Sequence, residues 1–312
     1  MPSAISYKRY AISHWPEIIV ALAPIVVFWR LVVGGQVLYW GLPSLQFVPW
    51  RVLVNDALRA GHLPLWTPLL GMGAPLMANH QSAVFYPPNW LGLAIPPEYA
   101  ISLLAVLHLS LAGVGMVRLA RRTGLGDFGA AIAGLTFGLS GYLTGRLWFI
   151  TINNAMAWLP WIVAASTPLP SLDEHPERNA VKSKERRERG EGQGWGVRLS
   201  ALIALQLLAG HAQSSFYTLL IAGAWVVWRS WKRETLRALS QFGLAIVFAL
   251  CLTAVQLLPT LELLRESPRA AAAEYEFATT YSFWPWRLIT LVAPNFFGHP
   301  ALTPVGPAAL SL

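Results

Sequence analysis

Several side chains suited to chemistry lie in residues 34–97, a stretch that is rich in Pro, Gly and Trp. Asp56 is a carboxylate that can act as a general base when a hydroxyl group lies within hydrogen-bond reach. His80 and Gln81 are polar groups in a largely apolar setting. These polar residues are therefore candidates for a binding or catalytic site. Asp56 also fits an ion pair with Arg51 or Arg59 on a surface helix.

Three arginines are candidates for binding an anionic group. Arg146 separates two apolar runs, and Arg265 and Arg269 follow the last long apolar run. A guanidinium group matches the geometry of a phosphate, but it also anchors to lipid headgroups.

Two histidines lie within apolar runs. His211 follows Gly210 and precedes a polar Gln-Ser-Ser sequence. This pattern predicts a helix break, whose freed backbone groups need protein or water partners, and its polar side chains are candidates to line a substrate cavity. His108 lies inside a longer apolar run, and we expect it to form a hydrogen bond to a neighbouring helix.

Other chemistries lack their motifs. The sequence has no Gly-rich phosphate loop, no pair of histidines with metal-ligand spacing and no Ser-His-Asp arrangement. Its one cysteine, Cys251, lies in an apolar run, so it can form neither an internal disulfide framework nor a thiolate metal site. We therefore expect no metal and no cofactor.

The composition predicts a membrane protein. Of the 312 residues, 55% are hydrophobic and only 12% are charged, with a mean hydropathy of +0.47. Soluble domains carry about a quarter charged residues. The formal net charge of +8 comes from short Lys/Arg clusters between apolar runs, which is typical of cytoplasmic loops and not of a nucleic-acid interface.

The hydropathy pattern predicts an all-α polytopic membrane protein, a helical bundle in a single domain over residues 1–312. A long loop at 34–97, partly helical around Trp50 to Ala60, separates the first two spans. A charged loop at 167–198 and a tail at 259–312 complete the chain. The apolar stretch from Leu199 to Trp228 is too long for one span, so it is divided near Gly210. The predicted spans are residues 15–33, 99–119, 128–145, 147–166, 199–210, 212–228 and 239–258.

The distribution of basic residues predicts the orientation. With the N-terminus in the cytoplasm, 16 Lys and Arg residues lie inside and 6 lie outside, with Arg30 at the boundary. Positive charge favours the cytoplasmic side. We therefore expect a multi-pass protein of the inner (plasma) membrane, with the loop 34–97 and the tail 259–312 on the outer face.

A family resemblance follows from motifs in a fixed order along the chain. The strings GHLPLWTPLLGMGAP and ANHQSAVFYPPNWL resemble the first loop of the bacterial YfhO-type membrane proteins, which belong with the GT-C-like glycosyltransferases. Further similar strings run from about Gly34 to Gly298: AGVGMVRLARRTGLG, GLSGYLTGRLWFITINNAMAWLPW, LLAGHAQSSFY, LLPTLELLRESPR and YSFWPWRLITLVAPNFFG. Members of that family are usually much longer, so we expect this chain to be a truncated member.

The resemblance implies a GT-C-like bundle and a sugar transfer on the outer face. The donor would be a polyprenyl-phosphate-linked sugar, and the acceptor an envelope glycan or lipid. A loop carboxylate would activate the acceptor hydroxyl, and cationic groups would stabilise the departing lipid phosphate. Relatives carry an acidic residue near the position of Trp40-Gly41-Leu42-Pro43, where this chain has none. Asp56 is then the candidate catalytic base, and His80, Gln81, Arg146, His211 and Arg269 are the candidate substrate ligands.

The missing carboxylate keeps a second hypothesis open. The chain would then be a non-catalytic lipid or polymer transporter, or a degenerate member that only binds the lipid-linked substrate. A transporter is expected to show internal repeats and interrupted helices in matching halves. The sequence shows no repeat and one interrupted segment, so the enzyme is the favoured interpretation.

Overall fold

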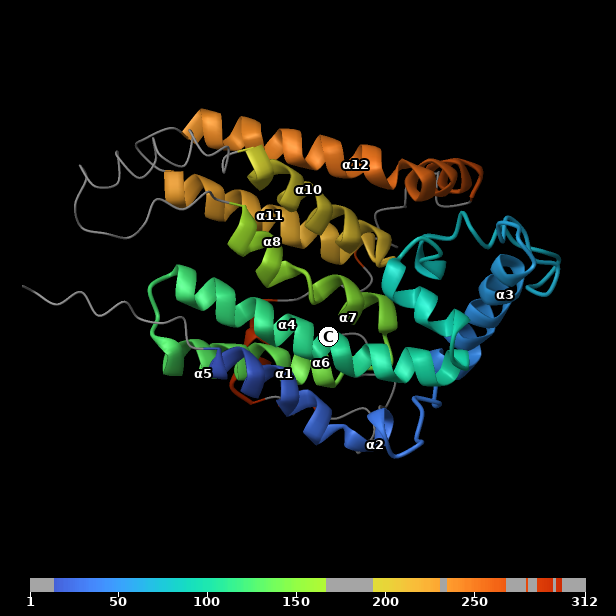
Figure 1. Ribbon diagram of the computed structural model, residues 1–312, viewed down its shortest axis with the longest axis horizontal. Helices are drawn as coiled ribbons and strands as arrows, with labels where there is room; N and C mark the ends of the chain where they lie inside the picture. Colours follow the sequence, from blue (N-terminus) through green and yellow to red (C-terminus); the bar gives the residue numbers. More distant parts are fainter. Residues whose placement is uncertain are drawn as a thin grey trace, which may run out of the picture. The chain divides into compact units, whose positions relative to one another are not determined.

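The computed structural model describes residues 14–166, 193–230, 235–267, 279, 285–293 and 296–298. These residues form helices joined by turns and loops, with one isolated β-bridge between Thr67 and Ala74 and no extended strand (Figure 1). The expected all-α class is thus confirmed for this part of the chain. The chain divides into a larger unit that ends at Leu263 and a small one that starts at Leu264.

The larger unit contains thirteen of the described helical elements and nearly all of a fourteenth. In chain order the α-helices are α1 (Trp15–Val27), α2 (Trp29–Val32), α3 (Val48–Arg59), α4 (Pro97–Arg122), α5 (Asp127–Gly138), α6 (Gly141–Thr144), α7 (Ile150–Met156), α8 (Leu159–Ala165), α10 (Gln193–Leu208), α11 (Ala212–Ser230) and α12 (Thr235–Glu266), whose last residues belong to the small unit. A π-helical turn, η1 (Pro43–Phe47), precedes α3, and two 3₁₀ turns, η2 (His80–Ser82) and η3 (Pro87–Leu93), follow it.

Helix α4 is the central element of this unit. It packs against α1, α5 and α8, and 14 of its 26 residues are buried. Its approach to α5 depends on glycine: a Cβ on Gly113 would lie 3.0 Å from the carbonyl oxygen of Gly134. Small residues allow helix backbones to approach closely, as they do in membrane helix packing. The small residues of α4 therefore allow it to pack closely against its neighbours.

Arginines gather at one end of the larger unit, which we call the arginine end and define by Arg118, Arg121 and Arg122. Arg121 pairs with Glu17 of α1 and, at 2.7 Å, with Asp127 of α5. The guanidinium of Arg118 lies 4.6 Å from the ring centre of Trp161 in α8. These contacts join the start of α1, the end of α4 and the start of α5.

Residues 34–97 cover the opposite end of the unit, which we call the loop end. The Leu38 backbone N–H donates to Ser102 Oγ near the start of α4, at 2.8 Å. Side chains of α12 also contact this loop: Gln256 Nε2 donates to the Met77 carbonyl oxygen at 2.8 Å, and Thr260 Oγ1 to that of Ala78 at 2.9 Å. The loop is thus fixed to helices that come both early and late in the chain.

Several helices are interrupted where the sequence analysis expected continuous spans. The ranges 128–145 and 147–166 each contain two short helices, α5 with α6 and α7 with α8. Ser140 accepts a hydrogen bond from the Leu143 backbone N–H and so caps α6. Pro160 lies in the first turn of α8, where its missing N–H does no harm. Local capping therefore divides these apolar ranges.

Two of the described helices are long and apolar enough to cross a membrane: α4, with 26 residues, and α12, with 32. They differ in their surroundings, because α4 is largely buried and α12 is largely exposed. The exposed side chains of α12 include Leu244, Val247, Phe248, Leu252 and Val255.

Most of the predicted charged loop 167–198, and much of the tail 259–312, lie outside the described residues. The small unit contributes a 3₁₀ element, η5 (Pro285–Leu291).

Candidate functional site

Four of the residues that the sequence singled out lie together at the loop end. His80 and Gln81 belong to η2, and a Cβ on Gly210 would lie 2.8 Å from the His80 carbonyl oxygen and 3.3 Å from Gln81 Cα. His211 follows Gly210 directly. Arg146 lies close enough to His211 for its positive charge to lower the pKa of that imidazole. We call these residues, together with Gln46, the polar cluster.

His80 closes the end of α10. Its Nε2 lies 2.8 Å from the carbonyl oxygen of Leu207, which can only accept, so Nε2 carries the proton. The last carbonyl groups of a helix lack partners within the helix, and His80 satisfies one of them. Burial lowers the pKa of His80 below its usual 6.5, which keeps the ring neutral at pH 7. Its Nδ1 is then a hydrogen-bond acceptor.

His211 caps the start of α11. Its Nδ1 accepts hydrogen bonds from the Ser214 backbone N–H at 3.1 Å and from Ser214 Oγ at 2.8 Å. The neutral ring therefore carries its proton on Nε2, which is a donor. The chain reaches this position through Gly210, whose φ of 89° is open mainly to glycine. Burial is the first cause that lowers the pKa of His211, followed by the positive charge that His80 carries when it is protonated and by that of Arg146.

Arg146 supplies the positive charge of the cluster. It lies in the turn between α6 and α7, is exposed, and places its guanidinium 4.6 Å from the ring centre of Tyr142. Tyr142 precedes Arg146 by four residues, and this spacing was a signal in the sequence that the two side chains would meet. A guanidinium that stacks on an aromatic ring keeps its in-plane N–H donors free for a ligand.

Gln46 is a member of the polar cluster that the sequence analysis missed. Its Nε2 donates to Gln81 Oε1 at 3.0 Å, so η1 and η2 meet at this point. The two residues are separated by 35 positions. One glutamine in an apolar turn gives too weak a signal to predict such a pair.

The arrangement suits an anion. Arg146 is cationic, and His211 Nε2–H is a donor. Apart from the Ser214 N–H, which His211 already satisfies, the first backbone N–H groups of α11 have no partner inside the helix and mark the positive end of its dipole. Helix N-termini that are supported by cationic side chains bind phosphate groups readily. The polar cluster can therefore hold a phosphate, and its amide groups can contact neighbouring hydroxyls.

Asp56 lies apart from the polar cluster. It is exposed on α3, and its carboxylate lies 3.6 Å from Arg59 Nη1. Ten residues of mostly helical chain separate it from Gln46, which corresponds to about 15 Å of helix rise. Of the two arginines considered as its partner, Arg51 is instead buried, and burial lowers the pKa of that guanidinium to about 10. The catalytic role of Asp56 stays a prediction.

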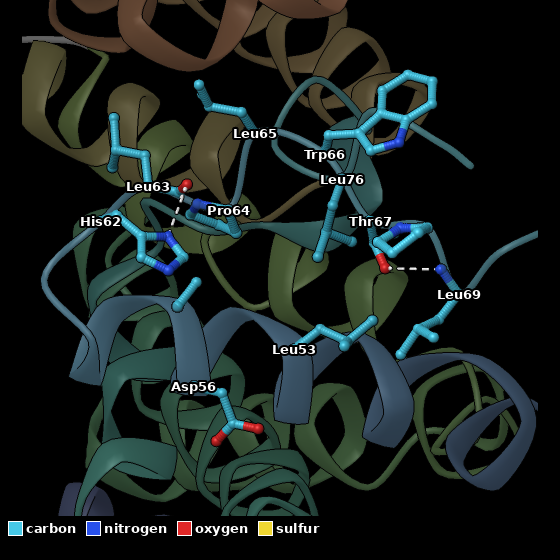
Figure 2. Close-up of a pocket in the computed structure, with 12 residues that line it drawn as sticks. Leu53, Asp56, His62, Leu63, Pro64, Leu65, Trp66, Thr67, Leu69 and Leu76 are labelled. Atoms are coloured by element: carbon cyan, nitrogen blue, oxygen red, sulfur yellow. Dashed lines mark hydrogen bonds between the residues drawn. The ribbon is translucent and has the colours of Figure 1, made fainter.

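Asp56 lines an apolar groove of about 580 Å³ between α3 and the loop that follows it. Figure 2 shows Leu53 of α3 facing Leu76 and Thr67, whereas the Asp56 carboxylate points away from the other lining residues. The remaining walls come from the segment His62 to Leu69. The groove is thus a surface for apolar groups, with a carboxylate at its border.

The remaining candidates have separate places. Arg269 lies outside the described residues, and Arg265 belongs to the small unit. His108 forms a hydrogen bond as expected, but its Nε2 partner is the hydroxyl of the loop residue Tyr86, at 2.6 Å, and not a neighbouring helix. Trp158 Nε1 donates to the same hydroxyl at 2.9 Å. This network fixes the loop to α4 and to Trp158, the N-cap residue of α8.

Metal binding has no visible basis in the part of the chain that is described, where no group of three or more His, Cys, Asp or Glu side chains is placed to hold an ion. Comparison of the chain with models of protein families, with curated proteins and with solved structures found no match in any of the three.

Proposed function

We propose that this protein is a polytopic enzyme of the inner membrane that transfers a sugar from a polyprenyl-phosphate-linked donor to an envelope acceptor on the outer face. The observation that carries the proposal is the polar cluster, in which His80 and Gln81 lie against Gly210, beside His211, and the charge of Arg146 acts on His211. Three observations support a membrane location: α4 and α12 are long and apolar enough to span a membrane, the apolar side chains of α12 are largely exposed, and the sequence contains the family-like strings. The GT-C-like fold is part of the same proposal.

The polar cluster would bind the phosphate that links the sugar to its lipid. Arg146, His211 Nε2–H and the start of α11 supply the positive charge and the hydrogen-bond donors. When the sugar leaves, negative charge grows on the phosphate oxygens, and donors that are already in place stabilise that charge without reorganising. Gln46 and Gln81 offer amide groups to the hydroxyls of the sugar.

The acceptor hydroxyl requires a base. Asp56 is the candidate from the sequence, and His80 Nδ1 is an acceptor inside the cluster itself. A general base must lie within hydrogen-bond reach of the proton that it removes, directly or through one water. Asp56 fills this role only if the acceptor extends along α3. Asp56→Asn and His80→Gln test the two residues separately.

The central experiment measures transfer of radiolabelled sugar from polyprenyl-phosphate donors in membranes that contain the protein. We expect Arg146→Ala to weaken donor binding about 10- to 100-fold, because a hydrogen bond to a charged group is worth about 1.5–3 kcal/mol. Arg146→Lys should recover part of this loss. Arg30→Ala is the matched control, because Arg30 is also exposed and lies 5.7 Å from the ring of Trp29, outside the cluster.

One observation favours a second function, binding of the lipid-linked substrate without catalysis. Among the described residues, none of the members of the polar cluster is a carboxylate, and Asp56 is about 15 Å of helix away. Donor binding that depends on Arg146, with no transfer to any acceptor, would support a transporter or a degenerate binding protein. Loss of transfer in Asp56→Asn with donor binding preserved would instead establish Asp56 as the base.

A further inference from the structure

The segment 60–97 contains no Asp, Glu, Lys or Arg, although much of it is exposed. Soluble globular domains carry charges at about a quarter of their positions. The apolar side chains of this segment are not all turned inward: Met72 is fully exposed, and Leu69 and Trp66 are exposed by 73% and 60%. Large exposed apolar patches mark surfaces that bind a partner or a membrane.

One part of this surface is a tip that we define as Thr67–Ala74, which carries the fully exposed Met72. Two hydrogen bonds of 2.9 Å, from Thr67 N–H to the Ala74 carbonyl and from Ala74 N–H to the Thr67 carbonyl, close its base. Gly73 has a φ of 105°, and a Cβ there would lie 2.5 Å from the Trp66 ring. The backbone of the tip is thus fixed in a shape that presents Leu69 and Met72 outward.

The apolar groove continues directly from this tip. Leu65, Trp66 and Leu69 line the groove and are also exposed to the surroundings (Figure 2). The groove and the tip therefore form one apolar surface, with Asp56 as the only formally charged side chain among the residues that line the groove. The Asp56 carboxylate points away from the other lining residues (Figure 2) and lies 3.6 Å from Arg59 Nη1, so it does not enter the space that a hydrocarbon chain would occupy.

We propose that this surface docks on the outer leaflet of the membrane, with the tip Thr67–Ala74 among the acyl chains of phospholipids and the groove in contact with them. The absence of charge over the whole segment selects lipid over a soluble protein partner, whose interface would have a polar rim. Trp66 suits the boundary, because its ring is apolar and its N–H can face the headgroups. The proposal depends on the membrane location proposed above but not on sugar transfer.

The test uses fluorescent labels on single cysteines in protein reconstituted into phosphatidylcholine vesicles. In the Cys251→Ala background, Met72→Cys reports on the tip and Leu65→Cys on the groove. Ala60→Cys, exposed at the end of α3 beside polar residues, is the matched control. We expect nitroxides on the acyl chains to quench most of the emission at positions 72 and 65, and aqueous iodide to quench only the label at position 60.

Native Cys251 separates failure of this proposal from failure of the membrane location. It is exposed in the middle of α12. Quenching of a Cys251 label by nitroxides, with the Met72→Cys label open to iodide, would overturn lipid docking and leave the membrane location intact. A label at position 72 that neither quencher reaches would mean that protein covers the tip, which also overturns docking. Iodide access at all positions would overturn both.

Discussion

Individual residues of the polar cluster combine structural and chemical roles. His80 satisfies the end of α10 through Leu207, and His211 caps α11 through Ser214, while each retains one ring nitrogen without a helix partner. The two histidines therefore hold the break between α10 and α11 in shape. Their remaining nitrogens, an acceptor on His80 and a donor on His211, are the atoms that we propose to contact the substrate.

The lowered pKa of both histidines makes stability dependent on pH. Because the folded pKa lies below the unfolded value of 6.5, the unfolded chain binds more protons in mild acid. The free energy of unfolding should then fall as the pH drops below about 6.5, by at most about 1.4 kcal/mol per pH unit for each histidine. Thermal unfolding in detergent between pH 7.5 and 5 measures this slope.

The variant His80→Gln isolates one contribution, since the Gln amide can still donate to the Leu207 carbonyl. We expect a shallower slope in this variant and a stability close to wild type at pH 7.5. An unchanged slope would show that His80 takes up no extra proton on unfolding. The double variant with His211→Gln should flatten the curve further.

At the scale of elements, the site depends on the turn that joins α10 to α11. The sequence predicted a break near Gly210, because the apolar stretch 199–228 is too long for one span and too short for two full spans. The sequence also predicted a short amphipathic helix around Trp50 to Ala60, where α3 lies. It could not predict that Arg51 would be buried, since burial depends on how η3 packs against α3.

Hydrogen bonds between residues far apart in the chain could not be predicted from the sequence either. The contact of Gln46 with Gln81 requires two turns to meet over 35 residues, and His80 reaches Leu207 over 127. Neither pair produces a periodic pattern. The interrupted helices α5–α6 and α7–α8 were missed for the opposite reason, because hydropathy averages over a span and is insensitive to a single capping Ser140 or to Pro160.

Substitution of Gly210 tests the α10–α11 turn. In Gly210→Ala the new Cβ would meet the His80 carbonyl oxygen at 2.8 Å, at a φ of 89° that strains any residue with a side chain. We expect a loss of about 1–3 kcal/mol in unfolding free energy, together with weaker donor binding as His80 and Gln81 are displaced. Denaturation in detergent and a donor-binding assay measure the two effects.

The matched control for this turn is Gly243→Ala in α12, where a new Cβ meets nothing within 4 Å. Alanine in place of glycine inside a helix should raise stability by about 0.5–1 kcal/mol. If both variants gained stability, Gly210 would not be under the constraint that its geometry indicates.

At the scale of the molecule, the two ends of the larger unit differ in their residues. The arginine end holds Arg118, Arg121 and Arg122, and the loop end holds the uncharged segment 60–97 together with the polar cluster. The predicted count of 16 basic residues inside and 6 outside assigns the first end to the cytoplasm. The proposed sugar transfer and the proposed lipid docking both require the loop end to face outward.

This orientation can be tested with a membrane-impermeant thiol reagent in the Cys251→Ala background. Ala60→Cys lies at the loop end, and Gly126→Cys lies between α4 and α5 at the arginine end, where a new side chain meets open space. We expect the cysteine at position 60 to react in intact cells and the one at position 126 to react only after the membrane is permeabilised. The reverse pattern would place the polar cluster on the cytoplasmic side, where lipid-linked sugar donors of the outer face could not reach it, and the proposed function would fall even if the cluster binds phosphate.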